Sequence, residues 1–210
     1  LLELANKYDF YIIEDDYLSE LIYDNNIKHK PLKSLDKHDR VIYIKSFSKI
    51  FLPGIRLGYM ITPSSFNEII QSSKINTDIS TSSLMQRALE LYISEGLWKK
   101  NIDYQQRMYK EKYLLMKELI DKELSDKVSY IDPKGGLYFY LEIKNKNIKS
   151  TDLFYRLKKK NLFITPGTIL FKDSSDGDYF FRISFSQASK KKIVEGINLI
   201  KEELKWVMLL

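Results

Sequence analysis

The sequence predicts an α/β fold that is divided into a sheet domain, a connecting helix and a smaller α+β domain. Short apolar runs alternate with amphipathic segments up to about residue 95. One long helical pattern occupies residues 96–125, and strand and helix patterns mix from residue 126 to residue 210. Because alternating strands and helices favour parallel pairing, residues 1–95 are predicted to contain a mainly parallel sheet.

The strands of the first domain are predicted from three apolar runs, residues 10–13, 41–44 and 57–61. A helix is expected before them, over residues 1–8, and the polar residues 25–39 are expected to form a loop. Ser64 or Ser65 is predicted to cap a helix over residues 66–74. The first run is read as a buried strand that stops at Glu14-Asp15-Asp16, so these acids are expected at the sheet edge where open α/β sheets bind ligands.

The rest of the chain is predicted to form four helices and four strands. The helices are residues 82–94, 97–124, 151–160 and 189–204, where apolar residues recur at helical spacing. The strands are residues 128–131, 136–143, 162–164 and 179–185. Gly96 is predicted to end the first of these helices. In residues 136–143, apolar residues alternate with Tyr138, Tyr140 and Glu142, so one face of that strand is expected to be buried.

Composition indicates a globular protein, with 44% hydrophobic and 30% charged residues among 210. No apolar run reaches the roughly 18 to 20 residues that span a bilayer, so no membrane segment is expected. The absence of cysteine excludes disulfides and thiolate sites and is compatible with a cytoplasmic location. His29 and His38 lie in a polar stretch, and no metal site is expected there.

The net charge of +6 can indicate nucleic-acid binding, but its distribution argues against this for these residues. The two compact runs, residues 158–160 and 190–192, fall in predicted helices and are interpreted as solvated faces. The first residues already have a helical pattern without an initiator methionine, so we expect a fragment of a longer protein.

One predicted turn concentrates groups that bind anions and react as amines. Ser46-Phe47-Ser48-Lys49 follows the strand over residues 41–44, and Arg56 comes seven positions after Lys49. A lysine amine can bond covalently to an aldehyde, while hydroxyls and a guanidinium bind a phosphate. A carboxylate from residues 14–16 could keep a pyridine nitrogen protonated. These groups suit a phosphorylated aldehyde cofactor that is held as a Schiff base.

An ordered set of motifs resembles the fold-type I pyridoxal-phosphate (PLP) aminotransferases of class I/II. The motifs are Glu14-Asp15-Asp16-Tyr17, Ser46-Phe47-Ser48-Lys49, Pro53-Gly54-Ile55-Arg56-Leu57-Gly58, Gly135-Gly136-Leu137, Pro166-Gly167 and Phe181-Arg182-Ile183-Ser184-Phe185. Each motif alone is weak, but together they follow the family's order. The resemblance implies the C-terminal part of a PLP-transferase large domain, followed by a smaller α+β C-terminal domain. It covers about the last half of a complete PLP domain, so weak or absent PLP binding is expected of this chain alone.

The resemblance implies roles for the residues of the turn. Lys49 resembles the catalytic lysine that forms the Schiff base with PLP. Arg56 and Ser46, with Ser48, resemble the residues that bind the cofactor's phosphate. An isolated lysine in a turn is more often a surface residue, and the flanking strands and Arg56 favour the functional interpretation here.

Residues outside the turn also match the family's site. Asp15 resembles the partner of the pyridine nitrogen, with Asp16 as its rival, and Tyr17 resembles the tyrosine that contacts the ring hydroxyl. Arg182 resembles the arginine that binds a substrate α-carboxylate; a structural ion pair is the alternative. Asp15 could instead be a helix cap, and Ser48 and Tyr17 could serve packing alone.

Two kinds of relative share these motifs. In free-standing aminotransferases of the aminoadipate or kynurenine type, a residue usually separates the second acid from the tyrosine. In MocR-type regulators of the GntR superfamily, Glu-Asp-Asp-Tyr is uninterrupted, as it is here. The resemblance therefore favours the effector-sensing domain of such a transcriptional regulator, which binds an amino compound as a PLP aldimine.

The regulator hypothesis implies further partners. DNA would be bound only through a winged-helix domain that precedes these residues, and a homodimer is expected because fold-type I sites are commonly built at a dimer interface. A free-standing PLP-dependent aminotransferase that acts on an amino acid is the alternative. A structural remnant that has lost PLP is the third hypothesis.

Overall fold

The computed structural model describes residues 1–205 and forms two compact units, which divide between Gln105 and Gln106. The helix α4 (Leu97–Glu123) runs from the first unit into the second, and its bounds match the predicted long helix. The predicted domain boundaries at residues 95 and 126 stay a prediction. The last residues of the predicted small domain, 206–210, lie outside the described residues.

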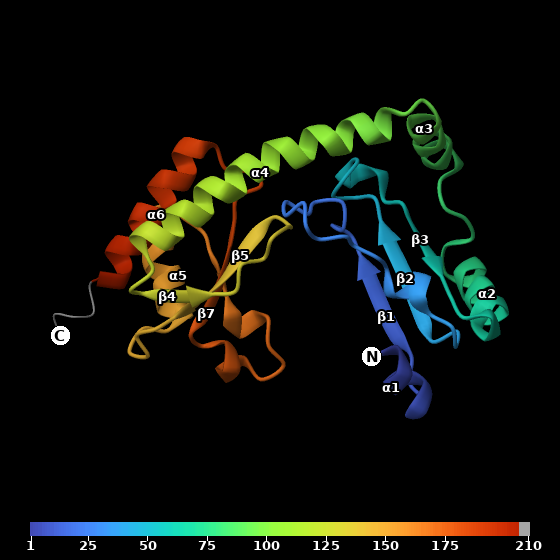
Figure 1. Cartoon of the computed structure of the whole chain (residues 1–210), viewed down its shortest axis with the longest axis horizontal. Helices are drawn as coiled ribbons and strands as arrows, with labels where there is room; N and C mark the ends of the chain where they lie inside the picture. The colour runs from blue at the N-terminus through green and yellow to red at the C-terminus, as the bar shows by residue number, and fades with distance from the viewer. Residues whose placement is uncertain (206–210) are drawn as a thin grey trace. The chain divides into compact units, whose positions relative to one another are not determined.

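The first unit contains a three-stranded sheet (Figure 1). Its strands are β1 (Ile12–Asp16), β2 (Val41–Ser46) and β3 (Gly58–Ile61), in that order. The pair β1–β2 is parallel, whereas β2–β3 is antiparallel. Residues 47–57, between β2 and β3, contain only the 3₁₀ turn Pro53–Ile55 and no crossover helix, and β3 returns antiparallel to β2.

The predicted limits of the first strand are wrong. Residues 10 and 11 precede β1, and Asp15 and Asp16 lie inside the strand, paired with Ile44 and Lys45 of β2. The strand is also not fully buried, because Ile13 is 68% exposed. The two acids belong to the strand because their backbone groups pair with β2, and this pairing does not depend on the type of side chain.

The helices of the first unit are α1 (Leu2–Lys7), α2 (Asn67–Asp78) and α3 (Ser83–Ser94). Short 3₁₀ turns cover Leu32–Leu35, Pro53–Ile55 and Ser64–Phe66. The predicted serine cap of α2 is wrong, because Ser64 uses both its hydroxyl and its backbone N–H to bind the carboxylate of Asp39. Gly96 follows α3 with a φ of +69°, a left-handed conformation that favours glycine.

The second unit contains an antiparallel sheet of four strands. Their spatial order is β4 (Val128–Tyr130), β5 (Tyr138–Ile143), β7 (Phe180–Ser184) and β6 (Thr165–Pro166). The helices are α5 (Ser150–Lys158), α6 (Lys190–Lys205) and the second part of α4, and Gly167–Ile169 and Ser174–Gly177 form 3₁₀ turns (Figure 1).

The core of the second unit follows the predicted alternation in β5. Leu137, Phe139, Leu141 and Ile143 are buried, as predicted. They share the core with residues of the three helices, including Tyr113, Met116, Leu153, Leu157, Ile193 and Ile197. Each fully buried aliphatic or aromatic side chain contributes about 1.5–3 kcal/mol to folding.

The predicted strand over residues 162–164 is wrong. The chain is still leaving α5 there, because the N–H of Leu162 bonds the carbonyl of Leu157 and Asn161 has a φ of +58°. Pairing with β7 begins only at Thr165, opposite Arg182. Among residues 1–205, no helix is both long and apolar enough to cross a bilayer.

Candidate functional site

The turn between β2 and β3 is held by close backbone packing. Ser46 pairs with Gly58, and one step further the N–H of Phe47 donates to the carbonyl of Leu57 at 3.1 Å. A Cβ atom on Gly58 would lie 2.6 Å from the carbonyl oxygen of Lys45, so only glycine permits this approach. The two arms of the turn, which carry Ser48 and Arg56, therefore stay adjacent.

Lys49 presents a free amine from an anchored backbone. The side chain is exposed and forms no hydrogen bond or ion pair with any of residues 1–205. The next residue, Ile50, is fully buried, and its carbonyl accepts hydrogen bonds from the side-chain amides of Asn101 and Gln105, each at 2.8 Å. The position of the lysine is thus fixed by its neighbour, while its amine remains available for reaction.

The phosphate-binding residues predicted from the sequence lie on the same turn. Arg56 is exposed, ends the 3₁₀ turn Pro53–Ile55 and has a φ of +51°. Ser46 and Ser48 are half-buried, and the N–H of Ser48 lies 3.4 Å from the Ser46 hydroxyl oxygen. Within residues 1–205 no carboxylate pairs with Arg56, so the turn presents a cation and two hydroxyls without an anion.

The two rival acids point to opposite faces of the sheet. Asp15 is exposed and shares its face with Ile42 and Ile44, whereas Asp16 is 8% exposed and shares its face with Tyr43 and Lys45. Burial alone would raise the pKa of Asp16, but hydrogen bonds from Tyr43 and Ser19 and the charge of Lys45 together lower it. Burial and the hydrogen bond to this carboxylate raise the pKa of the Tyr43 phenol.

Tyr17 directly follows β1 and is half-buried. It lies in the turn between Asp16 and Ser19, where the Ser19 N–H and hydroxyl donate to the Asp16 carboxylate at 3.2 and 2.8 Å. The position of the tyrosine therefore depends on this turn.

Arg182 belongs to the second unit and lies on β7. It is partly buried, pairs with Tyr140 of β5 and Thr165 of β6, and its guanidinium lies 4.9 Å from the centre of the Tyr138 ring. No acidic side chain among residues 1–205 forms an ion pair with it. The alternative of a structural ion pair therefore has no support in the described part of the chain.

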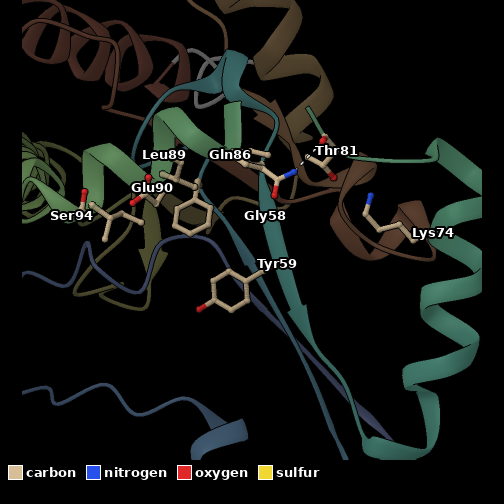
Figure 2. Close-up of a pocket in the computed structure, with 11 residues that line it drawn as sticks. Gly58, Tyr59, Lys74, Thr81, Gln86, Leu89, Glu90 and Ser94 are labelled. Atoms are coloured by element: carbon tan, nitrogen blue, oxygen red, sulfur yellow. Dashed lines mark hydrogen bonds between the residues drawn. The ribbon is translucent and has the colours of Figure 1, made fainter. Parts of the chain in front are cut away.

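The first unit also contains an open pocket of about 600 Å³. Figure 2 shows its lining residues, which include Tyr59 of β3, Lys74 of α2, and Gln86, Leu89 and Glu90 of α3. The dashed line in Figure 2 is the bond from the Gln86 amide to the Thr81 carbonyl. None of the residues predicted for the site lines this pocket, although Phe47, two positions before Lys49, does.

A buried polar cluster beside the turn was missed by the sequence analysis. Lys45, only 5% exposed, lies 2.6 Å from Glu20 and 3.2 Å from Asp16 and donates to Ser19 at 3.1 Å. The available signal was the spacing of Val41, Tyr43 and Lys45, which places the lysine on the buried face of β2.

Comparisons with known proteins agree with this architecture. The model of the family "Aminotransferase class I and II" matches residues 1–200. An uncharacterised aminotransferase of Saccharolobus solfataricus is 34% identical over 205 residues, which are 98% of this chain and 50% of the relative. The HTH-type transcriptional regulator TauR of Rhodobacter capsulatus is 31% identical over 208 residues, which are 98% of this chain and 42% of the relative.

A solved structure is similar over the whole chain. The kynurenine aminotransferase of Pyrococcus horikoshii, solved in complex with PMP, matches with a TM-score of 0.93 and 31% identity, over 100% of this chain and 51% of that chain. The chain belongs to the class I and II aminotransferase family. It spans about half the length of the relatives that it matches.

Pyridoxal phosphate is the cofactor that this membership implies, and the donors of the turn fit it. The turn between β2 and β3, whose strands approach closely at Gly58, presents a free amine, two hydroxyls and a guanidinium without a carboxylate partner among the described residues. These are the groups that an aldehyde and a phosphate dianion require. The exposed carboxylate of Asp15, on the neighbouring strand, suits a protonated ring nitrogen.

Proposed function

We propose that this chain is the PLP-binding, effector-sensing domain of a MocR-type transcriptional regulator of the GntR superfamily. The proposal that the chain binds PLP rests on the free Lys49 amine, which lies on an anchored turn that also presents Arg56. The regulator part is supported by the uninterrupted Asp16-Tyr17 sequence and by the similarity to TauR.

Each site residue then has a defined task. When bound, pyridoxal phosphate supplies a reactive aldehyde and an electron-withdrawing ring. The Lys49 amine would hold the aldehyde carbon covalently, with release of water, and Arg56 with Ser46 and Ser48 would neutralise the phosphate. Asp15 would hold the proton on the ring nitrogen.

The remaining residues act on the ring hydroxyl and on the ligand. Tyr17 would hydrogen-bond the ring hydroxyl. Arg182 would bind the carboxylate of an amino-acid ligand bidentately, as its planar guanidinium permits. An amino ligand that replaces the Lys49 amine and changes the affinity of the whole protein for DNA would make the domain a sensor.

The alternative function is a free-standing aminotransferase that acts on an amino acid. The similarity to the Pyrococcus horikoshii kynurenine aminotransferase favours it. In that case the Lys49 amine would also move the proton at the α-carbon of the substrate.

The regulator proposal includes two further expectations. The protein would be a cytoplasmic homodimer, and only a domain outside these residues would contact DNA.

Absorbance spectroscopy tests the cofactor assignment. The full-length protein, incubated with PLP, is expected to develop the visible band of a lysine-bound cofactor. Lys49→Ala should lose this band, whereas Lys37→Ala, a change of an exposed lysine outside the turn, should keep it. A Lys49→Ala protein with an undiminished band would refute the assignment.

A second pair of measurements separates the two functions. A regulator should bind DNA from its own promoter region, with an affinity that changes when PLP and an amino acid are both present. An enzyme should transfer amino groups from an amino acid to a 2-oxo acid at a rate independent of DNA. Rapid turnover without DNA binding would exclude the regulator hypothesis.

A further inference from the structure

Five polar side chains, three of them buried and two half-buried, form a cluster at the carboxyl ends of β1 and β2. They are Asp16, Ser19, Glu20, Tyr43 and Lys45. The Asp16 carboxylate accepts hydrogen bonds from the Tyr43 phenol at 2.6 Å and from the Ser19 hydroxyl at 2.8 Å. The Lys45 ammonium bridges Asp16 and Glu20, and the side chains of Lys45 and Asp16 are only 6% and 7% exposed.

The cluster fixes the turn that carries Tyr17. Its contacts begin at Asp16, immediately before the tyrosine, and end at Ser19 and Glu20 after it. Lys45 reaches all three of these residues from the neighbouring strand. The turn is therefore held from both sides of Tyr17, by its own hydrogen bonds and by a cation on β2.

The same contacts determine what Asp16 can do. Its two carboxylate oxygens already accept hydrogen bonds from the backbone N–H and the hydroxyl of Ser19 and from the Tyr43 phenol. The carboxylate also forms an ion pair with Lys45. Asp15, on the opposite face, is exposed and has no such partners among residues 1–205. Alternation along the strand means that orienting Asp16 inward also orients Asp15 outward.

We propose that Asp16 and Lys45 are positioning residues, which hold Asp15 and Tyr17 in place for the cofactor ring, and that Asp16 is not itself the ring-nitrogen partner. This inference rests on the proposed function, because it concerns the ring of the same cofactor. It assigns to Lys45 a task that is separate from phosphate binding by the turn.

Two aldehydes, PLP and pyridoxal, test this separation in the full-length protein. Both carry the ring, but only PLP carries the phosphate. Lys45→Met should weaken the binding of both aldehydes by a similar factor, about tenfold, the equivalent of one well-placed hydrogen bond. Arg56→Ala, the matched control, should weaken PLP much more than pyridoxal. A Lys45→Met protein that is folded and binds both aldehydes as tightly as the wild type would overturn the proposal.

A spectral comparison of the two acids completes the test. Asp15→Asn should change the absorbance of the bound cofactor and its pH titration, because the ring nitrogen loses its anionic partner. Asp16→Asn should weaken binding and leave the titration of the bound fraction close to that of the wild type. An Asp16→Asn titration altered as strongly as that of Asp15→Asn would overturn the assignment.

Three further outcomes separate failure of the positioning role from failure of the proposed function. If Lys45→Met does not fold, Asp16→Asn decides by the same comparison of PLP with pyridoxal, since it keeps the size of the side chain. If Lys49→Ala retains the visible band, the proposed function fails. If Lys49→Ala loses the band while Lys45→Met and Asp16→Asn bind normally, only the positioning role fails.

Discussion

Replacing Gly58 by alanine should separate the two strands that carry the lysine turn. The added Cβ would lie 2.6 Å from the Lys45 carbonyl oxygen, about 0.8 Å inside the 3.4 Å at which ordinary contacts begin. The obstacle is backbone, which cannot rotate away as a flexible side chain could. Overpacking of this kind costs about 1–3 kcal/mol, and we expect a value in the upper half of that range.

Gly54 provides a matched control for this substitution. It belongs to the same motif, but a Cβ added there meets no atom within 4 Å, and its φ is not in the left-handed range. Gly54→Ala should therefore change the free energy of unfolding by less than about 1 kcal/mol, and it can stabilise the protein by restricting the unfolded chain.

Equilibrium urea unfolding of the full-length protein, with PLP affinity measured in parallel, gives the result. Gly58→Ala should unfold at lower urea and bind PLP more weakly, because Ser46 lies opposite Gly58 in the ladder. Equal midpoints and equal PLP affinities for Gly58→Ala and Gly54→Ala would refute the argument from backbone contact.

Three further predictions concern other parts of the chain. The folded-state pKa of Asp16 is lowered from 3.8, so the ionised carboxylate stabilises the folded protein above that pH and this stabilisation is lost as the pH falls below it. The melting temperatures of wild type and Asp16→Asn should therefore differ at pH 7 and converge below about pH 4. Gly96→Ala should cost about 1–2 kcal/mol in urea unfolding, because its φ of +69° strains any residue with a Cβ; an unchanged midpoint would contradict this. A double-mutant cycle of Tyr138→Leu and Arg182→Met should give a coupling energy of about 0.5–1 kcal/mol, and additive effects would exclude the cation–π contact.

Local sequence patterns were sufficient for the long elements of the fold. The 27 residues of α4 and the alternation in β5 were predicted closely, because periodicity is decided by residues that are neighbours in the sequence. The start of β1 and the position of β6 were predicted wrongly. Both depend on pairing with a strand distant in the sequence, β2 or β7, which no local pattern specifies.

The same distinction applies to the site. The turn with Lys49 and Arg56 is local, so its residues could be named from the sequence. The orientation of Asp15 and Asp16 depends on the register with β2, which no local sequence pattern specifies. Lys45 and Asp16 each suggest an exposed position when considered alone; only together, at 3.2 Å, can they be buried.

Similarity to the relatives does not decide whether this part of the protein catalyses a reaction or senses a ligand. An aminotransferase and a DNA-binding regulator match nearly the same length of this chain, with 34% and 31% identity. Both relatives match almost all of this chain, which includes the proposed Lys49 and Arg182 positions, and binding a cofactor through a lysine and a carboxylate through an arginine would serve either function. The choice between catalysis and regulation then depends on how long the ligand-bound form persists: an enzyme must return the Lys49 amine quickly, whereas a sensor must keep it displaced long enough to alter DNA binding. The rate at which a bound amino acid is released or converted in the full-length protein is therefore the measurement that decides between the two functions.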